Sequence, residues 1–231
     1  EYFGANTDLE FADNDVLAIG SPAGEVAAVF NDYWNSDYAY SVSSLASPVG
    51  MDALRRLEAS AERFRQRTEV ASYLDAVERS SFANALRDYS LEFRWGQSEL
   101  IHDPWWKRDQ SRPGWQSALL ISGLAPHILA AVSEIIIVSP YFVPDRDVAD
   151  ALCAKARSGV PVRILTNSLA SNDVVAVHAG YSKYRRYLLE CGVELYELNE
   201  HLRTEQRKSF SWLENLEKSS LHAKTMIFDR E

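Results

Sequence analysis

The stretch EIIIVS at residues 134–139 is a short apolar run with the length and composition of a buried β-strand. It opens a region in which strand-like and helix-like patterns alternate. Helical spacing of apolar residues follows at 145–158 and 178–191, and strand patterns follow at 160–167 and 193–198. Gly159 and Gly192 come directly after the two helical patterns, where helices commonly end. This alternation predicts a mixed or parallel α/β sheet with helices on its faces.

A last strand is predicted at 221–228, and it carries the residues with the clearest chemistry. Side chains alternate along a strand, so His222 and Lys224 are expected to point to the same face. An imidazole beside an ammonium in an apolar strand needs a compensating group, and a bound phosphate is a natural one. Lysine supplies fixed positive charge, while histidine can shuttle a proton or attack phosphorus. Asp229 completes the candidate catalytic set from the strand end, where it is expected to orient or support the pair.

The rest of the chain predicts connecting structure. A strand is expected at 11–20 and a short helix at 25–34, followed by a loop at 36–48. A charged helical pattern runs from 51 to 93 with a break near 67–69, and a polar connector follows at 96–115. Tryptophans 105, 106 and 115 of this connector either pack against the domain or contact a lipid interface.

Composition limits the function further. The net charge of −9 argues against a nucleic-acid surface, which needs many Lys and Arg contacts to phosphate. No apolar run reaches the roughly 18 residues that a membrane span needs. Cys153 and Cys191 lack the spacing of a metal or redox motif, and we expect them to be buried free thiols.

The strings around the His-x-Lys-x4-Asp spacing make it more specific than a three-residue match. The chain resembles the phospholipase D superfamily, and within it bacterial cardiolipin synthases of the C type. The resemblance rests on seven strings: IVSPYFVP at 137–144, ILTNSLA at 164–170, VHAGY at 177–181, GVELYEL at 192–198, SLHAK at 220–224, EYFG at 1–4 and DNDVL at 13–17.

The resemblance implies a division of the chain into three parts. Residues 1–48 correspond to the tail of an N-terminal phospholipase D-like half, 49–95 to a helical connector, and 96–231 to the C-terminal half as far as its HKD motif. A first HKD motif would precede Glu1, and the Gly/Ser and Asn residues that follow the second motif would come after Glu231. We therefore expect the chain to be a fragment that holds one of two catalytic histidines.

The resemblance also implies a mechanism. In the family, one histidine attacks the phosphodiester to give a phosphohistidine, and the other protonates the leaving alcohol. An alcohol or water then releases the phosphatidyl group, with no metal or other cofactor. His222 would be the general acid/base and the absent histidine the nucleophile, although the sequence alone leaves these roles open. The implied partners are phospholipids and the missing half, with no nucleic acid, at the bacterial cell membrane through peripheral contact or a separate anchor.

Other candidate substrate-binding residues follow the strands of the predicted sheet. Ligands of open α/β sheets gather at the carboxyl ends of strands, which places Tyr141 near a cleft. The polar trio Thr166, Asn167 and Ser168 either lines this pocket or forms an ordinary turn. His178, at a predicted helix start, is either structural or part of the pocket.

Three functions remain open from the sequence. The first is a phosphatidyltransferase that makes cardiolipin. The second is a hydrolytic phospholipase D or nuclease of the same superfamily, in which water is the acceptor. The third is an inactive half-domain that binds lipid or a partner. The isolated chain is expected to have negligible turnover, because it supplies one of two required histidines.

Overall fold

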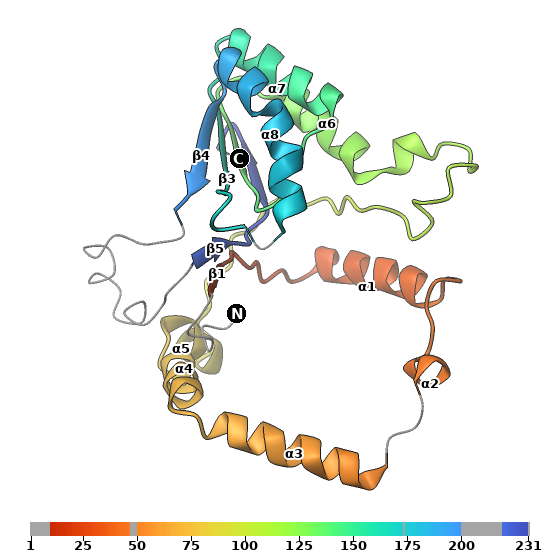
Figure 1. Ribbon diagram of the computed structural model, residues 1–231, viewed down its shortest axis with the longest axis vertical. Coiled ribbons are helices and arrows are strands. Elements are labelled where there is room, and N and C mark those ends of the chain that lie inside the picture. The colour runs from red at the N-terminus through yellow and green to blue at the C-terminus, as the bar shows by residue number, and fades with distance from the viewer. Residues whose placement is uncertain (1–9, 47–49, 173, 200–218, 231) are drawn as a thin grey trace. The chain divides into compact units, whose positions relative to one another are not determined.

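The computed structural model describes residues 10–46, 50–172, 174–199 and 219–230, in two compact units (Figure 1). One unit combines residues 1–17 with 101–231, and the other comprises residues 18–100. None of the described helices has the length and apolar character that a bilayer-spanning segment requires.

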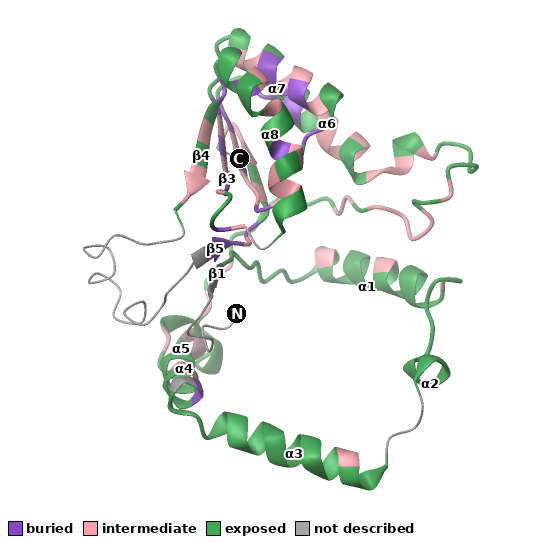
Figure 2. Ribbon diagram, viewed as in Figure 1, coloured by how far each residue is buried: buried purple, intermediate pink, exposed green. Residues whose placement is uncertain are grey.

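The unit of residues 18–100 is helical and has little core of its own. Its helices are α1 (Ser21–Trp34), α2 (Val42–Leu45), α3 (Met51–Arg65), α4 (Thr68–Glu78) and α5 (Ser81–Arg87). The predicted break near 67–69 lies between α3 and α4. Among the described side chains of this unit, Val70 is the one that is buried (Figure 2).

The other unit is built on a four-stranded sheet with the order β4-β3-β2-β6. Its strands are β2 (Ile135–Val138), β3 (Val162–Asn167), β4 (Glu194–Leu198) and β6 (Thr225–Phe228). β2, β3 and β4 are parallel, whereas β6 runs antiparallel to β2 with Val138 opposite Thr225. The start of β6 therefore lies beside the carboxyl ends of the parallel strands. The predicted mixed α/β sheet with flanking helices is confirmed.

Helices of this unit pack on the sheet through the buried apolar side chains of its strands. They are α6 (Leu120–Ala130), α7 (Arg146–Arg157) and α8 (Val175–Glu190), while the short η1 (Gln116–Ala118) contacts α6. α7 begins at Asp145, whose carboxylate accepts a hydrogen bond of 2.9 Å from the Val148 N–H. The core includes alternate residues of the central strands together with helix residues, among them Ile135, Ile137, Val162, Ile164, Leu152 and Leu188. Burial of this apolar surface holds the helices on the sheet.

The glycines after α7 and α8 have the conformation that the sequence predicts. Gly159 has φ 93° and Gly192 has φ 94°, in the left-handed region that side chains with a Cβ disfavour. Each glycine turns the chain directly into the next strand. The two strand–helix–strand units therefore have short, sharp returns.

The N-terminal and C-terminal strand predictions need correction. A strand at 11–20 was expected, but β1 covers only Glu10–Ala12, and the exposed residues after it form no regular strand. One continuous strand at 221–228 was also expected. Instead β5 (Ser219–Leu221) pairs in parallel with β1 in a separate two-stranded sheet, and β6 begins only at Thr225. The change of partner between β5 and β6 interrupts the strand at residues 222–224.

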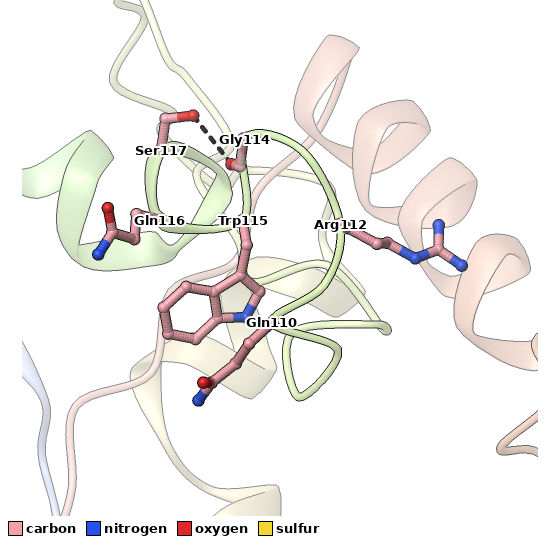
Figure 3. A pocket seen from close by; sticks show the side chains of 6 residues that line it. All are labelled: Gln110, Arg112, Gly114, Trp115, Gln116 and Ser117. Atoms are coloured by element: carbon pink, nitrogen blue, oxygen red, sulfur yellow. Dashed lines mark hydrogen bonds between the residues drawn. The ribbon is translucent and has the colours of Figure 1, made fainter.

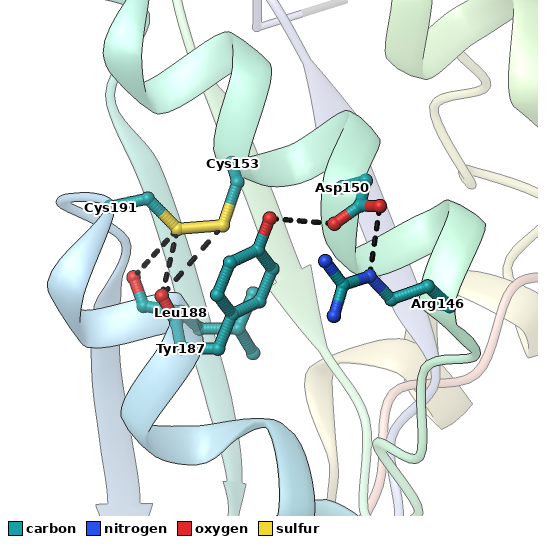
Figure 4. The surroundings of a disulfide bond; sticks show 6 residues. All are labelled: Arg146, Asp150, Cys153, Tyr187, Leu188 and Cys191. Carbon is teal, nitrogen blue, oxygen red and sulfur yellow. Dashed lines mark hydrogen bonds and ion pairs between the residues drawn. A yellow bond between two sulfur atoms is a disulfide. The ribbon is translucent and has the colours of Figure 1, made fainter.

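The two cysteines form a disulfide, so the prediction of free thiols is wrong (Figure 4). Cys153 lies on α7 and Cys191 directly follows α8, and their Cα atoms are 5.3 Å apart, within the range that a disulfide spans. Beside the disulfide, the Tyr187 hydroxyl donates a 2.6 Å hydrogen bond to Asp150. The disulfide links α7 to the end of α8.

Candidate active site

The candidate catalytic segment, residues 222–224, is held by the first strand of the chain. The backbone N–H groups of His222 and Ala223 both donate to the carbonyl oxygen of Ala12, at 2.8 and 3.1 Å. Ala12 is the last residue of β1, so the pairing of β1 with β5 continues into the segment. The backbone of His222 is thereby fixed beside the chain that follows β1.

The next residue along that chain contacts the imidazole. Oδ2 of Asp13 lies 2.7 Å from Nδ1 of His222, with both side chains only partly exposed. The hydrogen bond from His222 is the main cause that holds the pKa of Asp13 below its ordinary value. An Nδ1–H that donates to Asp13 leaves Nε2 available to exchange a proton with a ligand. The sequence pattern around Asp13 gave no sign of this contact.

Lys224 lies beside the same imidazole, within 3.5 Å of both ring nitrogens. Its Nζ lies 3.1 Å from Nε2 of His222 and donates to the His222 carbonyl oxygen at 2.9 Å. The ammonium also lies 5.7 Å from the ring centroid of Tyr141, a cation–π contact. The structure thus brings His222, Lys224 and Tyr141 together, near the carboxyl ends of β2 and β3. A cation beside a histidine nitrogen is suited to an anionic oxygen such as that of a phosphodiester.

Asp229 lies at the other end of β6, away from His222 and Lys224. Its carboxylate accepts hydrogen bonds from the backbone N–H groups of Val132, Ser133 and Glu134, at 2.9, 2.6 and 3.0 Å. These bonds, led by that from Glu134, hold the pKa of Asp229 far below its ordinary value. The carboxylate therefore ties the end of β6 to the turn that starts β2.

Asn167, the last residue of β3, is buried and its amide is hydrogen-bonded within the protein. Its Nδ2 donates to the Leu221 carbonyl at 3.0 Å and to Ser220 Oγ at 3.2 Å. Its Oδ1 accepts from the Leu221 N–H at 2.8 Å. The Asn167 side chain thus makes the two hydrogen bonds to the Leu221 backbone that a neighbouring strand would otherwise make. The predicted substrate-binding amide is occupied by these bonds.

The remaining predicted pocket residues are Thr166 and Ser168, which are hydrogen-bonded within the protein, and His178, which is not fully hydrogen-bonded. Thr166 is buried and donates to the Pro140 carbonyl at 3.5 Å, while Ser168 Oγ lies 3.0 Å from Ser171 Oγ. His178 lies in the first turns of α8, with its ring edge-on to Tyr181 at 5.7 Å. Its Nδ1 is buried without a hydrogen-bond partner in the structure. Burial is the main cause that raises the pKa of Tyr181 to about 12.

A hollow lies elsewhere, in the tryptophan-containing connector (Figure 3). It has a volume of about 500 Å³ and is lined by Gln110, Arg112, Gly114, Trp115, Gln116 and Ser117. The Arg112 guanidinium lies over the rings of Trp105 and Trp106, with its Cζ 5.2 and 5.1 Å from the two ring centroids. This hollow brings together no nucleophile with a base. Across the described residues, no group of three His, Cys, Asp or Glu side chains could hold a metal ion.

The mixed α/β sheet carries the His-x-Lys pair at the end where its parallel strands stop, as the resemblance to phospholipase D-like domains implies. The family model described as "Cardiolipin synthase, PLD-like domain" matches residues 124–231, and this part of the chain is similar to the phospholipase D-like domains of that family. The predicted resemblance is therefore confirmed.

Several curated relatives cover nearly the whole chain. Cardiolipin synthase C of Escherichia coli is 36% identical over 231 residues, which make up 99% of this chain and 48% of the relative. An uncharacterized protein of Helicobacter pylori is 26% identical over 99% of this chain and 44% of its own length. The chain thus spans about half the length of the curated relatives it matches.

Proposed function

We propose that the chain is part of a phosphatidyltransferase that makes cardiolipin through a phosphatidyl-histidine intermediate. The observation that carries this proposal is the cluster of three side chains in which Asp13 contacts Nδ1 of His222 while Lys224 Nζ lies 3.1 Å from Nε2 and 3.5 Å from Nδ1 of the same ring. Similarity to cardiolipin synthase C of E. coli supports the choice of product.

In the proposed reaction, His222 acts as general acid and base. A second histidine, supplied from outside this chain, attacks phosphorus as the bond to the leaving alcohol breaks. His222 gives its Nε2 proton to the oxygen of that alcohol. The acceptor alcohol, a hydroxyl of a second phospholipid, then loses its proton to Nε2 and attacks phosphorus, which frees the nucleophilic histidine. The overall reaction exchanges one phosphate ester for another.

The surrounding residues support these proton transfers. Asp13 accepts the Nδ1 hydrogen bond and so fixes the ring orientation and the tautomer that can use Nε2. Lys224 stabilises the negative charge on the phosphoryl oxygens. Tyr141 borders Lys224, and we propose it as a contact for the headgroup. His178, with its unpaired Nδ1, is a further proposed substrate contact.

Asp229, Asn167, Thr166 and Ser168 have a different proposed role. Each is hydrogen-bonded to the protein itself, and we propose that they position the catalytic segment. Asp229 holds one end of β6, while Asn167 holds the residue before His222. Neither needs to contact phosphate to affect the reaction.

Product analysis tests the proposed function. This chain can replace the aligned residues of E. coli cardiolipin synthase C, and the chimera can be given labelled phosphatidylglycerol. The expected product is labelled cardiolipin. Release of phosphatidic acid without cardiolipin would instead identify a hydrolase, and cleavage of a nucleic-acid substrate would identify a nuclease.

A further inference from the structure

The loop after β2, residues 140–144, is anchored by buried side chains although it forms neither helix nor strand. Pro140, Phe142 and Pro144 are buried, whereas Tyr141 and Val143 between them are at least partly accessible. The ring of each proline also fixes its own backbone φ. The loop therefore has few conformations in which it can present the Tyr141 ring.

α8 packs directly against this loop. Phe142 lies edge-on to Tyr181, with ring centroids 6.3 Å apart, and the buried Tyr181 donates a hydrogen bond of 3.2 Å to Glu197 of β4. Gly180 lies so close to Val143 that a Cβ added to the glycine would meet Cγ1 of the valine at 2.7 Å and Cγ2 at 3.3 Å. Val143 is β-branched and its χ1 angle is stiff, so its methyl groups cannot easily move aside. The loop can lie this close to α8 because residue 180 has no side chain.

The accessible side of the loop meets the candidate catalytic lysine. Lys224 is exposed, and its four-carbon stem gives the ammonium many possible positions. In the structure Nζ lies 5.7 Å from the ring centroid of Tyr141 and 3.1 Å from Nε2 of His222. The face of an aromatic ring attracts an ammonium, so Tyr141 favours those lysine conformations that keep the charge beside the imidazole.

We infer that Tyr141 is a positioning residue whose ring face holds the Lys224 ammonium beside His222. Gly180 in turn fixes Tyr141, because it lets α8 pack on the loop. The inference rests on the proposed function for the catalytic role of Lys224, and it gives Tyr141 a role distinct from contact with the headgroup. A lysine that is held in place before the substrate arrives loses less conformational freedom when it stabilises the phosphoryl oxygens. Tyr141 and Gly180 thus act on the reaction through Lys224.

Kinetics of the chimera separate positioning from headgroup contact. Tyr141→Leu should lower kcat by about 3- to 30-fold, because the ammonium loses the ring face that holds it. Tyr141→Phe keeps that face and should recover most of kcat. Loss of a headgroup contact alone would raise KM and leave kcat unchanged, and that result would overturn the inference. So would a kcat for Tyr141→Phe as low as that for Tyr141→Leu.

Gly180→Ala tests the packing that fixes Tyr141. The added methyl group meets Val143, so the loop must shift, and kcat should fall at least about threefold although alanine favours the helix. Val143→Ala in the same chain removes the two methyl groups that the new Cβ meets and should restore kcat. The matched control is Gly24→Ala in α1, where an added Cβ meets no atom within 4 Å and kcat should change less than about twofold. A kcat for Gly180→Ala equal to that of the control would contradict the role of Gly180.

A spectroscopic measurement on the 231-residue chain tests the same contact without turnover. With isotope-labelled lysine, the Hε protons of Lys224, assigned by their loss in Lys224→Arg, should resonate upfield of those of exposed lysines because the Tyr141 ring faces them. Tyr141→Leu should remove this shift and Tyr141→Phe should keep it. An Hε resonance at the position of exposed lysines in the unsubstituted chain would overturn the inference. If the shift is present but the chimera makes no cardiolipin, the proposed function fails while the positioning of Lys224 by Tyr141 stands.

Discussion

The carboxylate of Asp13 lies 2.7 Å from Nδ1 of His222, although 209 positions separate the two residues in the sequence. The contact forms because β1 pairs with β5 and brings the chain after Ala12 beside the catalytic segment. The geometry of the candidate site thus depends on both ends of the described chain. In the proposed reaction, Asp13 is the group that keeps Nε2 of His222 ready for proton transfer.

Asp13→Asn should lower kcat of the chimera by about 10- to 100-fold, with a smaller change in KM. The asparagine keeps the size of the side chain but removes the negative charge that faces Nδ1 of His222 and orients the ring. Cardiolipin formation from phosphatidylglycerol, measured over a range of substrate concentrations, separates the two constants. Asp15→Asn, at an exposed carboxylate two residues along, is the control and should leave both constants unchanged. Equal rates for the two variants would remove Asp13 from the mechanism.

Asn167→Ala should destabilise the unit by about 2–3 kcal/mol, because the buried N–H and carbonyl of Leu221 lose their partners. Urea unfolding of the 231-residue chain, followed by circular dichroism, measures the change. Asn31→Ala on the exposed surface of α1 should stay within about 0.5 kcal/mol. A negligible effect of Asn167→Ala would mean that the amide does not hold the catalytic segment.

Asp229 should give the chain an acid-sensitive contribution to stability. Its pKa in the folded state is lowered, so the stabilisation is present above the unfolded value near 4 and is lost as pH falls below it. Asp229→Asn should therefore lower Tm at pH 7 and reduce the loss of Tm between about pH 5 and pH 3. Asp32→Asn, at an exposed site on α1, should leave the pH profile unchanged. Parallel Tm profiles for Asp229→Asn and the unsubstituted chain would contradict this account.

The Cys153–Cys191 disulfide closes a loop with a sequence separation of 38. Chain-entropy arguments give about 3–4 kcal/mol for a loop of this size. The double substitution to alanine should lower the free energy of unfolding by up to this amount. Thiol titration provides a direct check on the bond: the unreduced, denatured chain should show no free thiol. Two reactive thiols in that sample would show that the cysteines are unpaired.

The sequence predicted those features that depend on local pattern. β2, β3 and β4 are central or neighbouring strands with apolar runs, and Gly159 and Gly192 mark the helix ends, so these elements could be located from short windows. Partner choice is not local. The interruption at residues 222–224 arises because β5 pairs with β1 while β6 pairs with β2. A window around His222 contains no information on either partner.

The residues of the candidate site likewise divide into those that the local sequence pattern indicates and those that depend on remote contacts. His222 and Lys224 were singled out by their spacing, and the rule on strand ends placed Tyr141 near a cleft without predicting its contact with Lys224. Asp13 was missed because its contact needs the remote pairing of β1. Asn167 was predicted as a pocket residue, yet its amide is bonded to a strand 54 positions later. A polar residue at a strand end can serve a ligand or a neighbouring backbone equally well, and only the three-dimensional contacts separate these uses.

The most direct test of the central claim compares the isolated chain, the chimera and the chimera with His222→Ala, each given labelled phosphatidylglycerol. The account predicts negligible turnover by the isolated chain, cardiolipin from the chimera, and a loss of at least about 100-fold on substitution of His222. Cardiolipin formation by the His222→Ala chimera at an undiminished rate would contradict it. So would robust turnover by the isolated chain that is abolished by His222→Ala, which would point to two copies sharing one site.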